Sequence, residues 1–412
     1  MSPGHPSPPA AGGRLVLALG LLFAGCAGAG AAAPGAAAPA AEMRFQEGTL
    51  VEVSSLDLEL AGKNDEELFA IGTAAYAAGN DRRAAASFGR IADAYPRSPH
   101  HATALFDAGL AHERLGEWRE ALARFRALAA GYSGADADEA AFHAAADLWH
   151  LGELTEARGA LDGLTHRADL STSNRIRAFT EKGVVELDLG DADAAERSLA
   201  RAVSLWQDEA DRERLDDYHP AQALYYLGEV SRRRSQAAVL DPARPGETAL
   251  AAGLERKAEL LLAAQGYYLR SIRVGNRDWA VASGYRIGEL YDGLHAEMTA
   301  AAAPPGLSAD EERAYRDELR RRLRVLLVKA IAVYEQTLSA ARRGAVENRF
   351  VEEAEASLER MKRALVDTDA LPAGPEAPGP GPEGAAPGEG GGRPAPGPLG
   401  HPYPAASPSP RG

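Results

Sequence analysis

Two His-containing stretches come nearest to a catalytic or metal-binding motif, and each lacks a residue that the chemistry requires. His112 and Glu113 begin the zinc-protease pattern HExxH, but position 116, where the second His must stand, is Gly. His143 and His150 lie two helical turns apart, with no third metal ligand in register. We therefore expect no catalytic residue, no metal site and no cofactor, and predict that the protein is not an enzyme.

A structural pattern occurs twice between Leu68 and Ser133. The offset between the copies is 37 residues (109 − 72 = 37). Each copy predicts a helix, a short turn at a second Gly, and another helix with apolar residues at i, i+4 and i+7. Because such a hairpin cannot bury its own apolar face, copies must stack. The first copy has Gly72, Gly79, Ala84, Phe88 and Pro96, and the second has Gly109, Gly116, Ala121, Phe125 and Ser133.

The residue types at these positions have mechanical reasons. Gly72 and Ala84 stand where two antiparallel helices approach closely, and Phe88 fills the space that they leave. Gly79 permits a tight turn, and Pro96 closes the second helix. These spaced positions resemble the tetratricopeptide repeat family.

The register continues downstream at close to the family period of ~34 residues. Two regular copies follow, with Ala145, Gly152, Ala157 and Leu161, then Gly183, Gly190, Ala195 and Leu199. In two later copies the second helix begins further along the sequence than in the regular copies. Their first helices contain Gly228 and Gly288, and their second helices contain Ala264 with Tyr268 and Ala330 with Tyr334. We interpret these as hairpins with elongated helices or inserted tips, at residues 240–248 and 302–308.

The predicted fold is all-α: a tetratricopeptide-like α-solenoid of about six helical hairpins plus a capping helix over Arg349–Leu365, with disordered N- and C-terminal segments. We divide the chain into a lipoprotein signal peptide (1–25), a lipidated Cys with a flexible tether and an extended segment (26–63), regular hairpins (64–210), elongated hairpins with the capping helix (211–366), and a Pro/Gly/Ala-rich tail (367–412).

The N-terminal region predicts an export signal. Arg14 precedes an apolar run at 15–23, and the run ends in Phe-Ala-Gly-Cys, which resembles the lipobox of bacterial lipoproteins. The resemblance implies cleavage before Cys26, the only cysteine among 412 residues, and acylation there. Ala27, which is not Asp, favours the outer membrane by resemblance to the enterobacterial sorting rule. The alternatives are an ordinary secretory cut within 27–33 and a start at Met43 that gives a cytoplasmic product.

Residues 49–60 alternate between apolar and polar types, which predicts an extended strand. The sequence offers no second strand to pair with it. We expect the segment to lie against the first hairpin and cover its apolar end. The alternative is a strand that adds to a partner's sheet or occupies the protein's own groove.

The net charge of −14 argues against nucleic acid as a partner, because basic faces supply most of that affinity. Resemblance to tetratricopeptide repeats implies a concave groove lined three residues before and four residues after the first Gly of each copy. Aromatic residues stand at the position three before the Gly in most copies. The alternative to a groove lining is that their rings pack as core between hairpins. With neighbouring charges, the predicted partner-binding residues are Phe69, Tyr76, Phe106, Glu113, Phe142, Trp149, Tyr225, Glu229, Arg232, Arg233 and Tyr285.

Two basic runs, Arg232–Arg234 and Arg320–Arg322, lie in the elongated hairpins. Acidic neighbours such as Asp317 and Glu318 can neutralise them as helix-surface pairs, which contribute little to stability. Alternatively, these projecting hairpins make a partner contact that the regular copies do not make.

The sequence therefore predicts a non-enzymatic envelope lipoprotein scaffold, anchored through Cys26 on the periplasmic face of the outer membrane. It binds protein or peptide partners and no small-molecule substrate. The late segments 267–276, 279–291 and 348–361 resemble the repeat lipoprotein of gliding-motility machines. The alternatives are a soluble adaptor without lipid, cytoplasmic or periplasmic, and a lipoprotein of outer-membrane barrel or pilus-secretin assembly.

Overall fold

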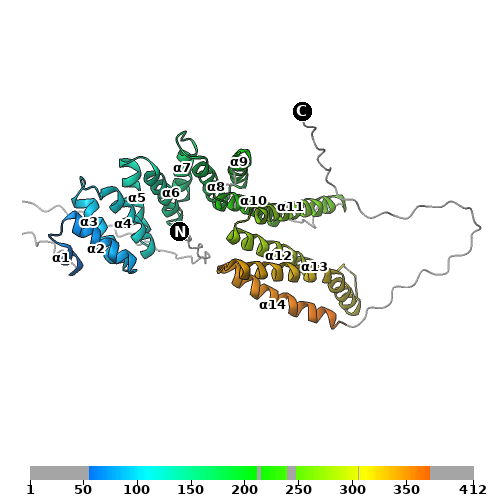
Figure 1. Cartoon of the computed structure of the whole chain (residues 1–412). Coiled ribbons are helices and arrows are strands. Elements are labelled where there is room, and N and C mark those ends of the chain that lie inside the picture. The colour runs from blue at the N-terminus through cyan, green and yellow to red at the C-terminus, as the bar shows by residue number, and fades with distance from the viewer. Residues whose placement is uncertain (1–54, 211–214, 239–246, 305, 372–412) are drawn as a thin grey trace, which may run out of the picture.

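The computed structural model describes residues 55–210, 215–238, 247–304 and 306–371, and every regular element in these ranges is an α-helix (Figure 1). The predicted signal peptide, Cys26, the tether, residues 49–54 and the tail beyond 371 lie outside the described residues. The helices are α1 (Ser55–Leu60), α2 (Asp65–Ala77), α3 (Asp81–Ala94), α4 (His101–Leu115), α5 (Trp118–Gly131), α6 (Ala135–His150), α7 (Leu154–Thr165), α8 (Thr172–Asp188), α9 (Ala192–Asp208), α10 (Tyr218–Ala237), α11 (Glu247–Val274), α12 (Arg277–Ala300), α13 (Ala309–Gly344) and α14 (Arg349–Asp369).

Local sequence explains where the early helices begin and end. The Asn64 side chain accepts a hydrogen bond from the backbone N–H of Glu67, whose carboxylate accepts one from the N–H of Asn64, so a capping box starts α2. The Asn80 side chain caps α3 with a single bond, which it accepts from the N–H of Arg83. Gly79, with φ of +73°, makes the turn between them, as the sequence predicted.

Within the described ranges, consecutive helices from α2 to α13 pair as six hairpins, and one contact recurs inside them. A Cβ added at Gly72 would lie 2.7 Å from the ring of Phe88, and one at Gly109 would lie 2.5 Å from Phe125. The ring therefore occupies the space that a side chain on the facing helix would need. The later partners are also those predicted: Gly183 with Leu199, Gly228 with Tyr268, and Gly288 with Tyr334.

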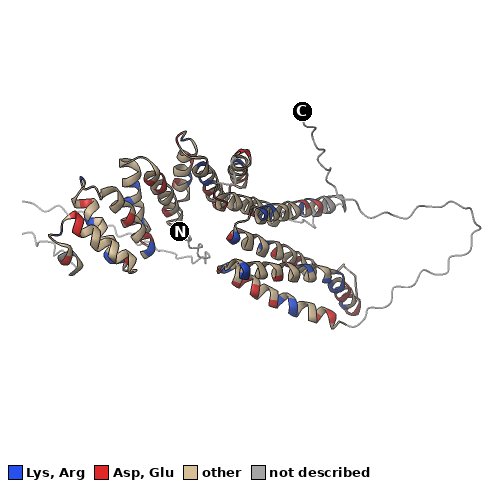
Figure 2. Ribbon diagram, in the orientation of Figure 1, with Lys and Arg blue, Asp and Glu red and all other residues tan. Residues whose placement is uncertain are grey.

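The last two hairpins are longer than the others, as predicted. The small and large partners lie 16 residues apart at Gly72 and Phe88 (88 − 72), but 46 residues apart at Gly288 and Tyr334 (334 − 288). α11 has 28 residues and α13 has 36, against 12 to 17 residues in the helices of the first four hairpins. These long helices run alongside α12 and α14 at one end of the solenoid (Figure 1). Lys, Arg, Asp and Glu are interspersed along them (Figure 2).

α14 covers the open end of the sixth hairpin and closes the core there. Its buried face includes Phe350, Ala354 and Met361, which belong to the same apolar cluster as Tyr285 and Tyr334. The helix extends to Asp369, where Arg324 of α13 donates two hydrogen bonds to the carboxylate. It therefore runs beyond residue 366, where we had expected the tail to begin.

The prediction of a strand over 49–60 is wrong for the residues that the structure describes. Residues 55–60 form the short helix α1. Leu60 is buried in the core of the first hairpin with Leu68, and Glu59 pairs with Arg83 at 2.5 Å. The expected covering of the first hairpin's apolar end is observed, but a helix supplies it.

Replacing Gly109 by Leu should lower the free energy of unfolding by about 1–3 kcal/mol, because the new side chain collides with the buried ring of Phe125. The matched control is Gly159→Leu. Gly159 is exposed inside α7, and a Cβ there meets nothing within 4 Å. Because Leu has the higher helix propensity, this control should be neutral or stabilising. Chemical denaturation of both variants measures the difference, and equal effects would mean that the helix-pairing register is wrong.

Candidate interaction groove

The predicted ring positions fall into two groups by burial. Phe142, Tyr225 and Tyr285 are only 0%, 3% and 8% exposed, so they form core between hairpins in this structure. Phe69, Tyr76, Phe106 and Trp149 are half-buried. Whether any of them contacts a partner stays a prediction, but only the second group offers ring surface without rearrangement.

The half-buried rings make specific contacts with the next hairpin. Phe69 stacks on His100 with ring centroids 4.2 Å apart, and Arg114 lies 3.8 Å over the Tyr76 ring. Trp149 donates a hydrogen bond from Nε1 to Asp188 Oδ2 at 3.0 Å. Each of these three contacts therefore joins the first helix of one hairpin to the next hairpin.

Glu229 is the centre of a buried charged cluster. It is 4% exposed and accepts hydrogen bonds from Arg232 at 2.7 Å and from the Tyr268 hydroxyl at 2.5 Å, and it pairs with Arg286 at 3.2 Å. Burial alone would raise the pKa of the Glu229 carboxyl, but the hydrogen bond from Arg232 and the charges of Arg286 and Arg232 hold that pKa below its usual value. The cluster joins α10, α11 and α12.

The first basic run also serves the fold. Arg233 donates to the Leu187 carbonyl at 2.7 Å, and Arg234 pairs with Glu196 at 2.7 Å and with Asp193 at 2.5 Å. These bonds connect α10 to α8 and α9. In the second run, Arg320–Arg322 pair with Asp317 and Glu318 three or four residues earlier, which are the helix-surface pairs expected from the sequence.

Replacing Glu229 by Ala should destabilise the protein by about 3–5 kcal/mol, because Arg286 and Arg232 would lose their buried counter-charge. The comparison is Arg234→Ala, which breaks two more exposed pairs and should cost less than about 1 kcal/mol. Denaturant titrations of both variants give these values. If Glu229→Ala lowers the free energy of unfolding no more than Arg234→Ala does, a structural role for the cluster is contradicted.

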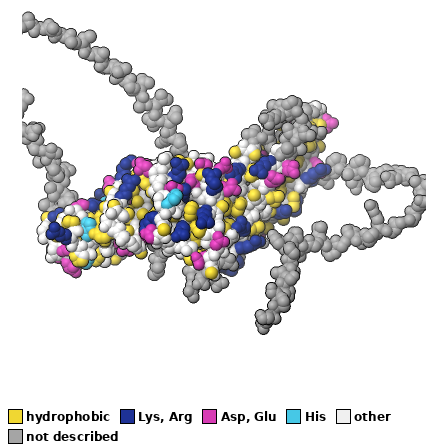
Figure 3. Space-filling view, turned by 90° about the horizontal axis from the view of Figure 1, so that it is seen from above, with side chains coloured by type: hydrophobic (Ala, Val, Ile, Leu, Met, Phe, Trp, Pro, Cys, Tyr) yellow, Lys and Arg dark blue, Asp and Glu magenta, His cyan; other side chains and the backbone are white. Residues whose placement is uncertain are grey.

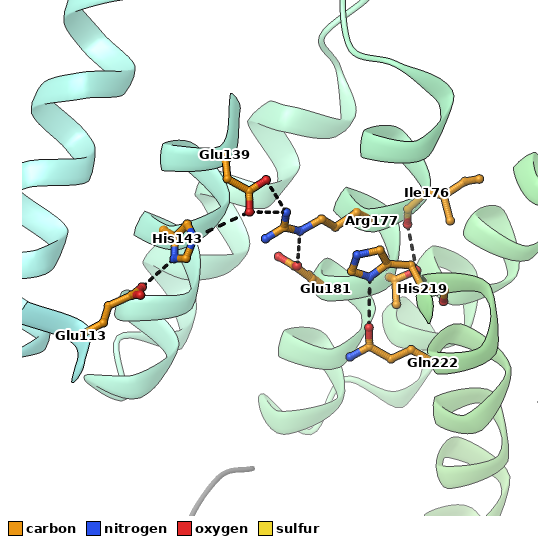
Figure 4. A network of polar contacts seen from close by, with 9 residues as sticks. Glu113, Glu139, His143, Ile176, Arg177, Glu181, His219 and Gln222 are labelled. Atoms are coloured by element: carbon orange, nitrogen blue, oxygen red, sulfur yellow. Dashed lines mark hydrogen bonds and ion pairs between the residues drawn. The ribbon is translucent and has the colours of Figure 1, made fainter. Parts of the chain in front are cut away.

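A ladder of polar side chains crosses the first helices of consecutive hairpins (Figure 4). Glu113 of α4 is hydrogen-bonded to His143 of α6 at 2.7 Å, and Glu139 of α6 accepts from Arg177 of α8 at 2.7 Å. Arg177 also donates to Glu181 at 2.7 Å. Burial alone would lower the pKa of Arg177, but the carboxylates of Glu181 and Glu139 raise it, so this cation stays charged.

A cavity of about 220 Å³ adjoins the end of this ladder. Its walls come from α6, α7, α8, α10, α12 and the first turn of α14, so four hairpins and the capping helix contribute. Most of its large lining side chains are rings, and we call this cavity with its lining the aromatic groove. The lining comprises Ala145, Ala146, Trp149, His150, Leu161, Glu181, Val184, Val185, Tyr218, His219, Gln222, Tyr225, Tyr226, Trp279, Arg349 and Phe350.

The aromatic groove is largely uncharged and holds polar atoms with altered properties. Burial raises the pKa of the Tyr218 hydroxyl to about 12, and burial lowers the pKa of His219, so both are neutral at pH 7. The indole Nε1–H of Trp279 is buried and has no hydrogen-bond partner among the described residues. A buried donor without an acceptor costs free energy.

Several residues of the polar ladder and of the aromatic groove were missed because we used only two positions of the register. Glu139, Arg177 and Gln222 each stand six residues before the small residue of their copy, at Ala145, Gly183 and Gly228. His143, Glu181 and Tyr226 each stand two before it. Applying the same alignment at these offsets would have found them. Trp279 and Phe350 have no such signal, because the ends of α12 and α14 bring them to the groove.

Asp147 is a buried carboxyl without a partner at the joint between the second and third hairpins. It is 0% exposed, and neither of its carboxylate oxygens has a hydrogen-bond partner among the described residues. The equivalent positions in the fourth and fifth hairpins hold Val185 and Val230, which are core residues. Burial, with the nearby charge of Glu113, raises the pKa of Asp147 to about 8.

This pKa makes the stability depend on pH. The folded protein holds the Asp147 proton up to about pH 8, whereas the unfolded chain releases it near pH 4, so the free energy of unfolding should fall as pH rises through this window, by up to about 1.4 kcal/mol per unit. Asp147→Asn should match the wild type near pH 4 and exceed it near pH 9. Denaturation at several pH values tests this, with the exposed Asp136→Asn as control. A difference between Asp147→Asn and wild type that does not change with pH would exclude the buried-proton account.

Among the described residues, no three or more His, Cys, Asp or Glu side chains are arranged to hold a metal ion. None of the described helices combines the length and apolar character needed to cross a membrane.

Comparison with known proteins identifies the repeats. The family model described as tetratricopeptide repeat matches residues 68–98 and 103–134, the two copies found first in the sequence. No curated protein matches the sequence.

Several solved structures are similar to this chain. A tetratricopeptide repeat protein from Parabacteroides merdae is 15% identical with a TM-score of 0.34, over 74% of this chain and 98% of that one. BtubC from P. vanneervenii is 13% identical with a TM-score of 0.32, over 75% and 95%. A Rap protein complexed with competence and sporulation factor is 13% identical with a TM-score of 0.35, over 76% and 80%.

The family model confirms the resemblance to tetratricopeptide repeats that was drawn from the sequence. Tetratricopeptide repeats are generally non-catalytic scaffolds for protein–protein interaction, and the stacked hairpins of this chain have that architecture. The chain is an all-α protein that contains tetratricopeptide repeats, two of them matched by the family model.

Proposed function

We propose that the protein is an envelope-anchored scaffold that binds an extended segment of a partner protein in the aromatic groove. The observation that carries the proposal is the groove itself, where the half-buried rings of Trp149, Tyr226 and Trp279 meet from three different helices. Rings of this kind provide large contact areas at low entropic cost and dominate the energetics of protein interfaces.

The size and charge of the groove favour a peptide over a small molecule. Its volume of about 220 Å³ is below the roughly 300–1,000 Å³ of most small-molecule sites, but it accommodates a few side chains. Basic and acidic side chains are interspersed on the face seen in Figure 3, so that face offers no broad patch of one sign. Together with the net charge of −14, this argues against nucleic acid.

The location is part of the proposal and depends on the sequence. The lipobox-like segment before Cys26 supports acylation and anchorage, and Ala27 supports the outer membrane. Resemblance of the late segments supports an envelope machine of the gliding-motility kind, with barrel or pilus-secretin assembly as alternatives. A soluble adaptor without lipid is the competing class.

Fractionation of wild type and Cys26→Ser tests the anchor. The wild type should sediment with membranes, and Cys26→Ser should not. If both forms are soluble, the lipid anchor is excluded and the soluble-adaptor alternative replaces it.

A charge placed in the groove should abolish partner capture. Ala146 is half-buried in the groove wall, so Ala146→Glu would insert a carboxylate between the rings without removing core packing. In cross-linking pull-downs from envelopes, the same partner should be recovered with wild type and lost by at least about tenfold with Ala146→Glu, equivalent to about 1.4 kcal/mol.

The control for this pull-down is Ala200→Glu, which changes an exposed position on α9 outside the groove. It should leave recovery unchanged. Equal recovery with Ala146→Glu would place the contact elsewhere, with the projecting α11 and α13 the next candidates.

A further inference from the structure

We infer that the chain's own Pro-rich segment at residues 393–404 (RPAPGPLGHPYP) occupies the aromatic groove until a partner displaces it. This rests on the proposed groove but names a specific occupant. Three features carry it: the chemistry of the groove wall, the composition of the segment, and the distance between the groove and the end of α14.

One wall of the groove is aromatic, as in the surfaces that recognise polyproline II segments. Tyr218, Tyr226 and Trp279 place adjoining rings there, with Trp279 centred 5.6 Å from Tyr218 and 5.9 Å from Tyr226. Proline-rich segments dock on such aromatic-lined surfaces.

The segment has the matching composition. Prolines stand at 394, 396, 398, 402 and 404, so the unbound chain already favours the extended form and loses little entropy on docking. Residues 393–412 contain two Arg and no Asp or Glu, in a chain of net charge −14. This local positive charge favours contact with the acidic remainder of the protein.

The geometry allows the contact within one molecule. The first turn of α14 contributes Arg349 and Phe350 to the groove, and its 21 residues end at Asp369, roughly 30 Å away at 1.5 Å per residue. Residues 372–392 comprise 21 residues, 8 of them Gly, and a chain of that composition is expected to span roughly 25 Å. A linker whose span matches the separation gives nearly the highest effective concentration, on the order of millimolar.

Fluorescence in the full-length chain tests this contact. Because Cys26 is the only cysteine, Cys26→Ser with Ala405→Cys gives one site for bimane, a dye that tryptophan quenches on contact. The four tryptophans are Trp118, Trp149, Trp206 and Trp279, and two of them line the groove. The dye should be quenched, and Trp279→Phe should raise its emission on the order of twofold, as expected for a mostly docked tail.

Matched controls separate docking from general effects. Trp206→Phe, on α9 outside the groove, should leave the quenching unchanged. Replacing the five prolines of 393–404 by Gly should relieve it, whereas Gly at Pro378, Pro380 and Pro382 in the linker should not. Val184→Glu blocks the groove wall while keeping all tryptophans, so it tests the contact if Trp279→Phe does not fold.

Each outcome decides between the proposals. Quenching that is absent, or unaffected by Trp279→Phe and Val184→Glu, overturns tail docking. Quenching that disappears when the labelled protein is diluted into buffer means that the tail of a second copy binds, which also overturns docking within one chain. If tail docking fails while Ala146→Glu still abolishes partner capture, only this inference is lost; if docking is observed without any capture, the proposed function fails instead.

Discussion

The contact between a small residue on the first helix and a large one on the second is the constraint on which the rest of the structure depends. Where Gly109 meets Phe125, the two helices approach so closely that no further atom fits. The same pairing at Gly228 with Tyr268, and at Gly288 with Tyr334, keeps this spacing in hairpins of very different length. Because the pairing fixes how each first helix is rotated, it determines which side chains face the groove.

The rotation explains the division between core and groove. From the third hairpin onward, residues three before the small position, such as Phe142 and Tyr225, turn into the joint between hairpins and are buried. Those six and two before it, such as Glu139 and Glu181, point toward the neighbouring first helix and form the polar ladder. Charged side chains near the groove are therefore largely paired within the protein, and the rings are left to provide the binding surface.

The repeats could be predicted from the sequence because their register is local: Gly79 ends a helix, Phe88 fills a gap, and the next copy repeats the pattern. The elongated hairpins followed from the same pairing at larger separation. Residues 55–60 were mistaken for a strand. Alternation of apolar and polar residues over so few positions does not exclude a short helix that packs one face against its neighbour. Trp279 and Phe350 could not be assigned to the groove, since their contacts join residues far apart in the sequence, as between Tyr225 and Phe350.

The central claim is that the aromatic groove is where this scaffold holds an extended segment. The most direct measurement places a photo-cross-linking amino acid at Val184, in the groove wall, and at the exposed Ala200 of α9, in otherwise native protein. Mass spectrometry of the products should show cross-links from Val184 to one defined extended segment, in the tail or in a partner, and none to that segment from Ala200. Cross-links from Val184 only to neighbouring helices, or the same products from both positions, would contradict the account.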